Sequence, residues 1–376
     1  MRLDTGGRID RRTPVRFYFN GRRYEGYRGD TVASALLANG VSVVGRGIEY
    51  RRPRGIVGSG ADESNAVVQV SEGAQTLPNQ LATQVDLYDG LTARSVNAWP
   101  SVDFDVRAAT GLFSRLMPPG FYYKAFMWPR GFWRRYEHLI RNATGLGVSP
   151  PEPDPDYYDR VDARCDVLVV GGGPVGLSAA LEAGRTGARV MLVDEQPELG
   201  GSLLDGRESI DGAPAMEWVA STLKELDSMD EVRLLTRSTA IGYYDHNFVA
   251  ALERVMDHRP ADAGLLPRQR LWRIRARQVV IATGAIERPL VFNNNDRPGI
   301  MLASAVSSYV NRYAVAPGSQ AVVFANNDSA YQTALDLADA DVAVEAVVDG
   351  RPDPTGDLPA KVRARGIEVV GGHAVV

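Results

Sequence analysis

The sequence predicts an α/β protein of two or three domains, and three observations carry that prediction. Residues 165–196 have the pattern of a strand, a glycine turn, a helix and a second strand. Residues 15–40 have the pattern of a β-hairpin followed by a helix, and residues 320–349 repeat the strand–helix–strand order. With 376 residues, the chain is long enough to bury a separate core for each of these units.

The composition is that of an ordinary globular protein. Hydrophobic residues make up 44%, charged residues 23%, and the formal net charge is −4. We therefore expect no nucleic-acid partner. The sequence has no run of eighteen or more apolar residues, so we also expect no membrane span. The single cysteine, Cys165, and four scattered histidines allow neither a disulfide framework nor a recognisable metal site. These features predict a cytoplasmic protein.

The first part of the chain, residues 1–110, predicts a β-grasp ferredoxin-like domain whose first residues, 1–14, form a polar tail. Residues 15–27 alternate as two strands around Asn20-Gly21, a strong hairpin signal. Residues 32–38 then form a helix that is capped at Thr31. A hairpin followed by a helix is the opening of such a domain.

The stretch at residues 43–70 lies where ferredoxin-like domains carry their iron–sulfur cysteines, and it contains none. A cluster held by thiolates is therefore excluded from this chain, however well the fold matches. Residues 1–54 hold twelve arginines against five acidic residues, a net charge of +7. This excess has two interpretations, a solvated face or a surface that docks against an acidic partner subunit.

Residues 111–160 predict an aromatic and proline-rich linker. Residues 112–136 interleave aromatic side chains with arginine and lysine. This pattern also occurs in segments that bind single-stranded nucleic acid or membrane surfaces. Three prolines break any long amphipathic helix there, which favours packing between domains or subunits. The proline-rich run at residues 149–156 is a stiff connection into the next domain.

The glycine turn after the apolar strand at residues 167–170 has the spacing of a dinucleotide-binding loop. Gly171, Gly173 and Gly176 fit G-x-G-x-x-G, which permits a tight turn, close approach of a pyrophosphate and packing of the helix on the strand. Pro174 suits the first helical turn, where its missing N–H is not needed. The remaining N–H groups of that turn form an anion site.

The second strand of this unit, residues 189–193, ends in Asp194 and Glu195, about twenty residues beyond the glycines. A carboxylate at this place accepts the ribose hydroxyls of adenosine and repels a 2′-phosphate, which favours NAD or FAD over NADP. The ordered set of strand, glycines, helix, strand and acid predicts a Rossmann-like FAD/NAD-binding domain, which we place at residues 161–317.

Three further segments are candidates for contact with the dinucleotide. The glycine loop at residues 198–202, which contains Gly201, either lies beside the dinucleotide or is an ordinary turn. Residues 238–244 are expected to pass near the adenine. The run VVIATG predicts a buried strand whose final turn, at Thr283 and Gly284, brings backbone close to the cofactor.

Residues 318–376 predict a partial second dinucleotide-type domain. Ala325, Asn327 and Ala330 stand where its glycines would be, and their side chains obstruct a pyrophosphate. We therefore favour a structural strand–helix–strand unit over a second nucleotide site. A complete domain needs on the order of 100 residues, and the chain stops at Val376, so we infer a truncated or split chain.

Long contiguous segments resemble the alpha subunit of heterotetrameric sarcosine oxidase, over essentially the whole chain and the N-terminal portion of a typical family member. They include GDTVASALLANGV, GRGIEYRRPRGIVGSG, PPGFYYKAFMWP, VVGGGPVGLSAALEAGRTGARVMLVDEQPELGGSL, VVIATGAIERP, NNNDRPGIMLASAV and VVFANNDSAYQTALDLA. Segments of this length are far more specific than a glycine motif.

The resemblance implies a complex that oxidises sarcosine to glycine, with NAD bound by the alpha subunit and non-covalent FAD and covalent FMN elsewhere in the complex. The partners would be a flavin-bearing beta subunit, which oxidises the amine substrate, and smaller subunits. Electrons would pass through the flavins to oxygen. A later folate-binding region of the alpha subunit, which this chain lacks, would transfer the one-carbon unit to tetrahydrofolate.

The resemblance also implies which residues of this chain contact NAD, and it assigns none a catalytic role in amine oxidation. Carried over by position, the glycine loop meets the phosphates, the acids after the second strand meet the ribose, Ser202 lies along the same ligand, and residues 240 and 241 present backbone to the adenine. The full set of candidate residues is Gly171, Gly173, Pro174, Val175, Gly176, Asp194, Glu195, Gln196, Gly201, Ser202, Ala240, Ile241, Thr283 and Gly284.

Three alternatives stay open. An independent flavin reductase, with FAD on the glycine loop, predicts an intact second glycine motif and a redox-active cysteine pair, and both are missing. A non-catalytic NAD-binding scaffold agrees with those absences. The corresponding subunits of N-methylglutamate dehydrogenase and of opine or cyanide-forming amino-acid dehydrogenases would bind FAD here.

Overall fold

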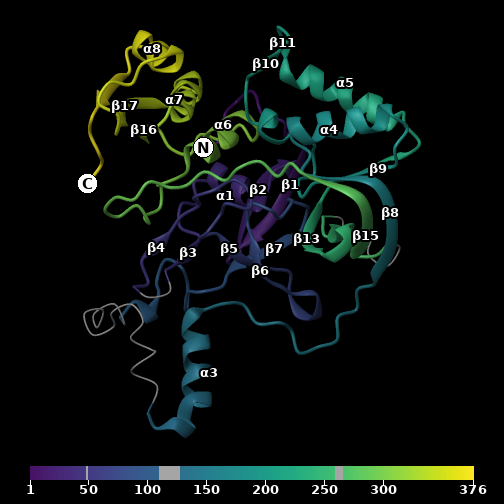
Figure 1. The fold of residues 1–376 in the computed structure, drawn as a ribbon. Coiled ribbons are helices and arrows are strands. Elements are labelled where there is room, and N and C mark those ends of the chain that lie inside the picture. The colour runs from purple at the N-terminus through teal and green to yellow at the C-terminus, as the bar shows by residue number, and fades with distance from the viewer. Residues whose placement is uncertain (48–49, 110–127, 259–265) are drawn as a thin grey trace. The chain divides into compact units, whose positions relative to one another are not determined.

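The computed structural model describes residues 1–47, 50–109, 128–258 and 266–376 of the chain (Figure 1). Two compact units are present, one formed by Met1–Asp154 with Glu287–Val376 and the other by Pro155–Ile286. Residues 111–127 of the predicted linker lie outside the described residues, and its later part includes a helix, α3 (Trp133–Thr144). Among the helices of the described ranges, none is both long and apolar enough to cross a membrane.

The first unit contains a mixed five-stranded sheet in the order β2-β1-β7-β5-β6. The predicted hairpin forms β1 and β2, and Asn20 and Gly21 at its turn have φ angles of 50° and 76°, as an Asn-Gly turn requires. The predicted helix is α1, where the side chains of Thr31 and Ser34 form a capping box. The elements of this part are β1 (Asp10–Phe19), β2 (Arg22–Arg28), α1 (Val32–Ala38), β3 (Gly45–Arg46), β4 (Pro53–Arg54), β5 (Val67–Val70), η1 (Gly73–Gln75), β6 (Leu77–Leu81), β7 (Leu91–Ser95) and η3 (Arg130–Phe132).

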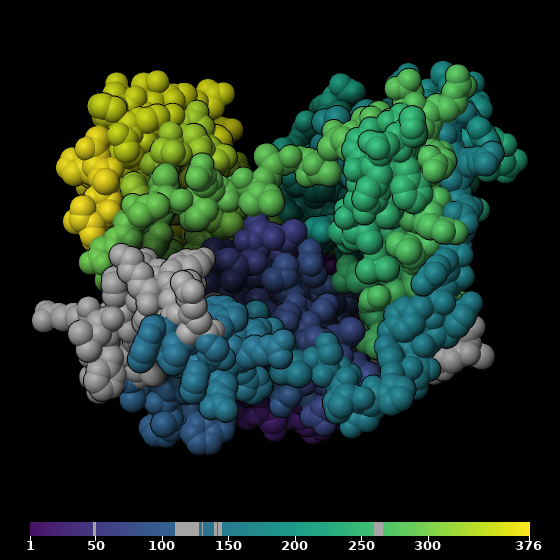
Figure 2. All heavy atoms as spheres, turned by 60° about the horizontal axis from the view of Figure 1, so that its bottom comes forward, coloured from purple at the N-terminus to yellow at the C-terminus, as the bar shows by residue number. Residues whose placement is uncertain are grey.

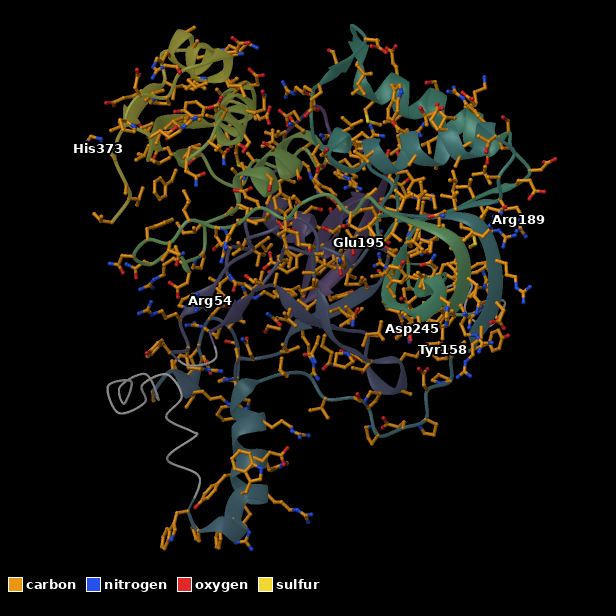
Figure 3. All side chains as sticks on the ribbon, viewed as in Figure 1. Arg54, Tyr158, Arg189, Glu195, Asp245 and His373 are labelled. Atoms are coloured by element: carbon orange, nitrogen blue, oxygen red, sulfur yellow. The ribbon has the colours of Figure 1, made fainter. Side chains whose placement is uncertain are left out.

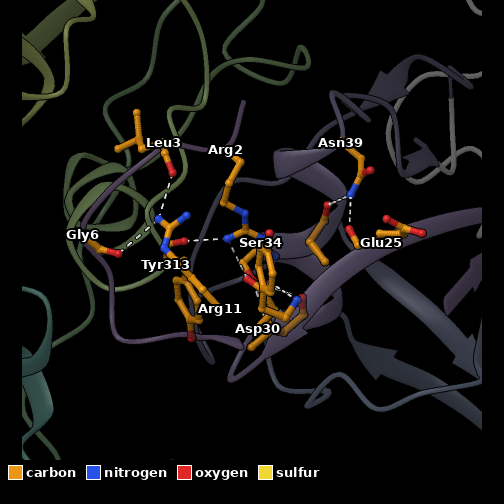
Figure 4. A network of polar contacts seen from close by, with 12 residues as sticks. Arg2, Leu3, Gly6, Arg11, Glu25, Asp30, Ser34, Asn39 and Tyr313 are labelled. Atoms are coloured by element: carbon orange, nitrogen blue, oxygen red, sulfur yellow. Dashed lines mark hydrogen bonds and ion pairs between the residues drawn. The ribbon is translucent and has the colours of Figure 1, made fainter. Parts of the chain in front are cut away.

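The N-terminal residues are anchored rather than free, so the prediction of a polar tail at residues 1–14 is wrong. The strand β1 already begins at Asp10. Before it, Arg2 forms a 2.6 Å ion pair with the fully buried Asp30 and donates a 2.6 Å hydrogen bond to the carbonyl of Tyr313 (Figure 4). A polar composition does not reveal these partners, because they lie far away along the chain.

The core of this sheet includes a helix from much later in the sequence. Phe17, Leu36 and Leu91 are fully buried in one cluster with Tyr309 of α6 (Ala303–Asn311). Residues after Ile286 therefore pack with the N-terminal unit, whereas the sequence places residues 161–317 in one domain. The apolar face of a helix is visible in sequence, but the core that it covers is not.

The last part of the first unit is a parallel three-stranded sheet, β16-β17-β18, accompanied by helices α7 and α8. Figure 2 shows these last residues in yellow as one lobe. The predicted strand–helix–strand order is present. Its elements are β16 (Gln320–Ala325), α7 (Ser329–Asp339), β17 (Ala343–Asp349), α8 (Asp357–Ala364) and β18 (Glu368–Gly371).

The second unit is built on a six-stranded sheet in the order β12-β9-β8-β15-β14-β13. The first four strands run parallel, and β14 and β13 are antiparallel. Val169 of β8 contributes to one buried cluster and its neighbours Leu168 and Val170 to another, so the central strand is buried on both faces. Its elements are β8 (Tyr158–Val170), α4 (Pro174–Arg185), β9 (Val190–Val193), η4 (Gly201–Leu204), β10 (Ser209–Ile210), β11 (Ala213–Pro214), α5 (Ala215–Asp227), β12 (Val232–Leu235), β13 (Ser238–Tyr244), η5 (Asp245–Asn247), β14 (Phe248–Arg254) and β15 (Gln269–Ile281).

Candidate functional site

The turn between β8 and α4 is too crowded for side chains. Gly171 has a φ of 105°, and a Cβ on it would overlap the carbonyl of Ala282. A Cβ on Gly176 would overlap the carbonyl oxygen of Gly171, so the helix lies directly on the turn. These two contacts explain why two of the three motif positions, 171 and 176, accept only glycine.

The N-terminus of α4 is open to a ligand. Gly173 is its N-cap, Pro174 is its first residue, and no side chain of the described residues caps it. The first N–H groups of a helix have no intrahelical acceptor, and the helix dipole makes this end positive. Val175, in the first turn, is 68% exposed. The geometry suits a pyrophosphate that lies across this end.

The carboxylate of Asp194 joins the end of β9 to the glycine turn. Its Oδ2 accepts a 2.5 Å hydrogen bond from the N–H of Gly172, and its Oδ1 accepts one of 2.7 Å from the N–H of Gln196. A carboxylate oxygen has two lone pairs, so contact with a ribose is still available. The structure nevertheless gives Asp194 a second role, because it holds the loop that would carry the phosphates.

Glu195 follows directly and is half-buried. Figure 3 shows it at the opposite end of β9 from Arg189. Its carbonyl accepts a 2.9 Å hydrogen bond from Nη2 of Arg254 on β14, which fixes the backbone at this end of the strand. Both acids predicted to meet the ribose therefore lie at the carboxyl end of the parallel strands, where open α/β sheets bind their ligands.

The glycine loop at residues 198–202 packs on the first glycine turn. The N–H of Gly200 donates a 2.9 Å hydrogen bond to the carbonyl of Gly172. Gly201 has a φ of +56°, and a Cβ on it would lie 2.7 Å from the Cα of Gly173. Ser202 is exposed next to this contact. The loop therefore lies beside the glycine turn, as the first of its two interpretations requires.

The beginning of β13 passes close to the end of β9. The N–H of Ser238 donates a 2.7 Å hydrogen bond to the carbonyl of Asp194, and the N–H of Arg237 donates one of 3.0 Å to the carbonyl of Gln196. Ala240 and Ile241 come two and three residues later, at a bulge in the strand pairing. These predicted adenine neighbours are thus linked to the acid end of the site through Ser238.

The segment after β15 meets the glycine turn from the other side. β15 runs parallel to β8, and the N–H of Ala282 donates a 2.7 Å hydrogen bond to the carbonyl of Val170. The backbone nitrogen of Thr283 lies 3.0 Å from the position of a Cβ on Gly171, whereas no described atom lies within 4 Å of one on Gly284. The strand was expected to be buried, but Ile281 at its end is 59% exposed. An apolar run indicates that a strand can be buried, but it does not show how much of the strand's surface other elements cover.

Sequence reasoning missed the residues that hold the site together. Gly172, an unspecified position of the motif, donates to Asp194 and accepts from Gly200, and a Cβ on it would overlap the side chain of Leu199. Three consecutive glycines were a signal that this position also excludes a side chain. Ser238 gave no such signal, because it acts through its backbone.

The second strand–helix–strand unit fills the equivalent positions with its own side chains. Oδ1 of Asn327 accepts hydrogen bonds from the N–H and the hydroxyl of Ser329, at 3.0 and 2.6 Å, at the start of α7. Asp349, at the end of β17, is fully buried and accepts bonds from Arg351 at 2.7 Å and Tyr331 at 2.8 Å. Burial and the bond to Asp349 raise the pKa of Tyr331 to about 12. These contacts support the structural interpretation of this unit.

Comparison with known proteins gives two family matches within the chain. Residues 12–98 match the family of 2Fe-2S iron-sulfur cluster binding domains, and residues 166–242 match FAD dependent oxidoreductases. The predicted ferredoxin-like and Rossmann-like domains are thereby confirmed at the level of fold.

The sarcosine oxidase alpha subunit of Rhizobium meliloti (strain 1021) is 51% identical over 100% of this chain. This chain is a homologue of sarcosine oxidase alpha subunits. The sarcosine oxidase alpha subunit of Corynebacterium sp. (strain P-1) is 43% identical over 98% of the chain. The chain covers 38% and 34% of the lengths of these two sarcosine oxidase subunits, so it corresponds to about a third of each.

Among solved structures, L-proline dehydrogenase from P. horikoshii superposes with a TM-score of 0.60 at 21% identity. The match covers 94% of this chain and 57% of that one. At this identity the likeness shows a shared fold.

Proposed function

We propose that this chain is the dinucleotide-holding part of an amine-oxidising complex of the sarcosine oxidase type. Three features of one unit carry the proposal. They are the uncapped N-terminus of α4, the glycine turn that leaves no room for side chains, and the carboxylates at the end of β9. The extent of identity to sarcosine oxidase alpha subunits supports the choice of complex. The reaction would be the oxidative demethylation of sarcosine to glycine, with electrons passed by flavins to oxygen and the one-carbon unit to tetrahydrofolate.

In this proposal the chain's own residues bind and orient. The N–H groups of Val175 and Gly176, in the first turn of α4, receive the pyrophosphate. The hydroxyl of Ser202 joins them, because the preceding residue, Gly201, packs on Gly173. Glu195 and Asp194 accept the ribose hydroxyls, and Gln196 borders the same sugar. Ala240 and Ile241 border the adenine, whereas Thr283 and Gly284 extend toward the other half of the dinucleotide.

NAD is the first candidate for this dinucleotide, and FAD is the second. NAD follows from the resemblance to the sarcosine oxidase alpha subunit, whereas the family match of residues 166–242 favours FAD. Both share the adenosine diphosphate half that the described site would hold. A bound NAD would supply a hydride acceptor or a structural anchor, and a bound FAD would place redox chemistry on this chain.

The amine substrate would meet a flavin-bearing beta subunit, and smaller subunits would complete a heterotetramer that we expect in the cytoplasm. The glycine loop and its neighbours offer hydrogen-bonding backbone and carboxylates, which suit a cofactor rather than catalysis of amine oxidation. We therefore assign this chain no catalytic residue.

The experiment that tests the proposal is the absorption spectrum of the purified chain, followed by release and chromatography of its bound nucleotide. A colourless protein that releases NAD supports the first candidate, and a yellow protein that releases FAD supports the second. A chain that carries neither, and that binds neither when titrated by calorimetry, would overturn the proposal.

A further inference from the structure

The ferredoxin-like domain lacks the cysteines with which the family that it matches binds a cluster. Residues 12–98 match 2Fe-2S cluster binding domains, yet the single cysteine of the chain is Cys165, outside that range. Such clusters are held by four thiolates, often with the spacing C-x₄-C-x₂-C followed by a distant fourth. The residues present therefore do not fit a cluster. The loop between β4 and β5 shows what stands there instead.

One carboxylate lies at the centre of that loop. Glu63 is 5% exposed. Its Oε2 accepts hydrogen bonds from the N–H groups of Val57 and Gly58, at 2.8 and 2.9 Å, and its Oε1 from those of Asn65 and Ala66, at 2.6 and 2.9 Å. Two carboxylate oxygens offer about four acceptor sites, so this side chain is saturated by backbone donors from both ends of the loop.

The donors coincide with the spacing of cluster ligands. With Glu63 as the middle position, C-x₄-C-x₂-C falls on Gly58 and Ala66, and both of these residues donate to its carboxylate. A Cβ on Gly58 would lie 2.7 Å from the backbone nitrogen of Glu63, so a cysteine no longer fits there. The loop is therefore closed around the carboxylate.

Two further side chains hold the loop from outside. The hydroxyl of Thr83, which is 2% exposed, donates a 2.7 Å hydrogen bond to the carbonyl of Gly60. The hydroxyl of Tyr309 on α6 donates one of 2.8 Å to the carbonyl of Gly58. The conformation of the loop is thus built into the core of the first unit.

We propose that the Glu63 carboxylate replaces an iron–sulfur cluster as the anion around which residues 57–66 are organised. Backbone N–H groups that donate to the sulfurs of a cluster can equally donate to a carboxylate, since both are anionic acceptors. The domain is then a redox-inert structural module, and electrons do not pass through residues 12–98. This inference does not depend on which dinucleotide the other unit binds.

The test compares Glu63→Gln with Glu72→Gln in the full chain. Glutamine keeps the shape of Glu63 but replaces one acceptor oxygen by an NH₂ group, so two of the four N–H groups lose their partner. Glu72 is an exposed carboxylate a few residues away and serves as the matched control. Hydrogen exchange followed by mass spectrometry is expected to be at least tenfold faster in peptides that cover residues 56–67 of Glu63→Gln, and unchanged in Glu72→Gln.

Iron and sulfide contents are measured on the wild-type chain after anaerobic incubation with ferrous iron and sulfide, with the visible spectrum recorded. The proposal expects no 2Fe-2S absorption and no stoichiometric iron. If Glu63→Gln does not fold, Glu63→Asp and Glu72→Asp replace the pair, and the shorter carboxylate of Glu63→Asp must still raise exchange in the same peptides. A stoichiometric cluster in the wild type, or wild-type exchange in the Glu63 variant, would overturn the proposal.

Discussion

Substitution of Asp194 by asparagine tests the site most directly. The variant keeps the size of the side chain but turns one of its two acceptor oxygens into a donor, which then faces the N–H of Gly172 or Gln196. A hydrogen bond to a charged group contributes about 1.5–3 kcal/mol. We expect the free energy of unfolding to fall by about that amount, and the melting temperature by roughly 5–10 °C for a unit of this size.

The same change should weaken dinucleotide binding, because Gly172 also positions Gly200 through a 2.9 Å hydrogen bond. If restoring the conformation of the loop uses about 1.4 kcal/mol of the binding free energy, the dissociation constant rises about tenfold. The assay is calorimetric titration of the nucleotide-free chain with NAD and with FAD, beside a thermal melt. Asp227→Asn, at the exposed end of α5, is the matched control.

Glu195→Gln separates the two roles of this acid end. If Glu195 contacts the ribose, its variant raises the dissociation constant of the dinucleotide, whereas Asp194→Asn both raises that constant and lowers the melting temperature. A melting temperature and dissociation constants for Asp194→Asn equal to those of the wild type would refute the assignment of this carboxylate to the loop.

Three further predictions follow from single contacts. Gly176→Ala should abolish dinucleotide retention, because its Cβ would overlap the carbonyl oxygen of Gly171; nucleotide release that matches the wild type would contradict this. Burial, with a smaller effect of Asp166, raises the pKa of Cys165 to about 11 from the ordinary 9.0, so alkylation by iodoacetamide at pH 8 should be roughly a hundredfold slower than in the unfolded chain. Hydrogen bonds from Arg189 lower the pKa of Asp166 to about 2 from 3.8, so their contribution to stability is present above about pH 4 and is lost as the pH falls toward 2. Melting temperatures of the wild type and Asp166→Asn should therefore converge over that interval, and a constant difference down to pH 2 would exclude this linkage.

Local rules predicted most of the elements around the site. Asn20-Gly21 required a hairpin turn, Thr31 began a helix, and Gly171 and Gly176 indicated a turn in which helix and strand touch. Each of these predictions depends on the conformations that a few neighbouring residues can adopt, which is why the sequence alone was sufficient. Of the predicted cofactor residues, most lie at or next to the glycine turn or the end of β9.

Contacts between distant residues were decided only by the tertiary structure. The sequence showed carboxylates at Asp194 and Glu63, but not that the first would hold a glycine loop or that the second would gather four backbone N–H groups. The sequence placed residues 303–311 in the dinucleotide domain, whereas Tyr309 of α6 enters the N-terminal core. Hydrogen bonds and burial depend on which segments the topology brings together, and residue type and local spacing do not contain that information.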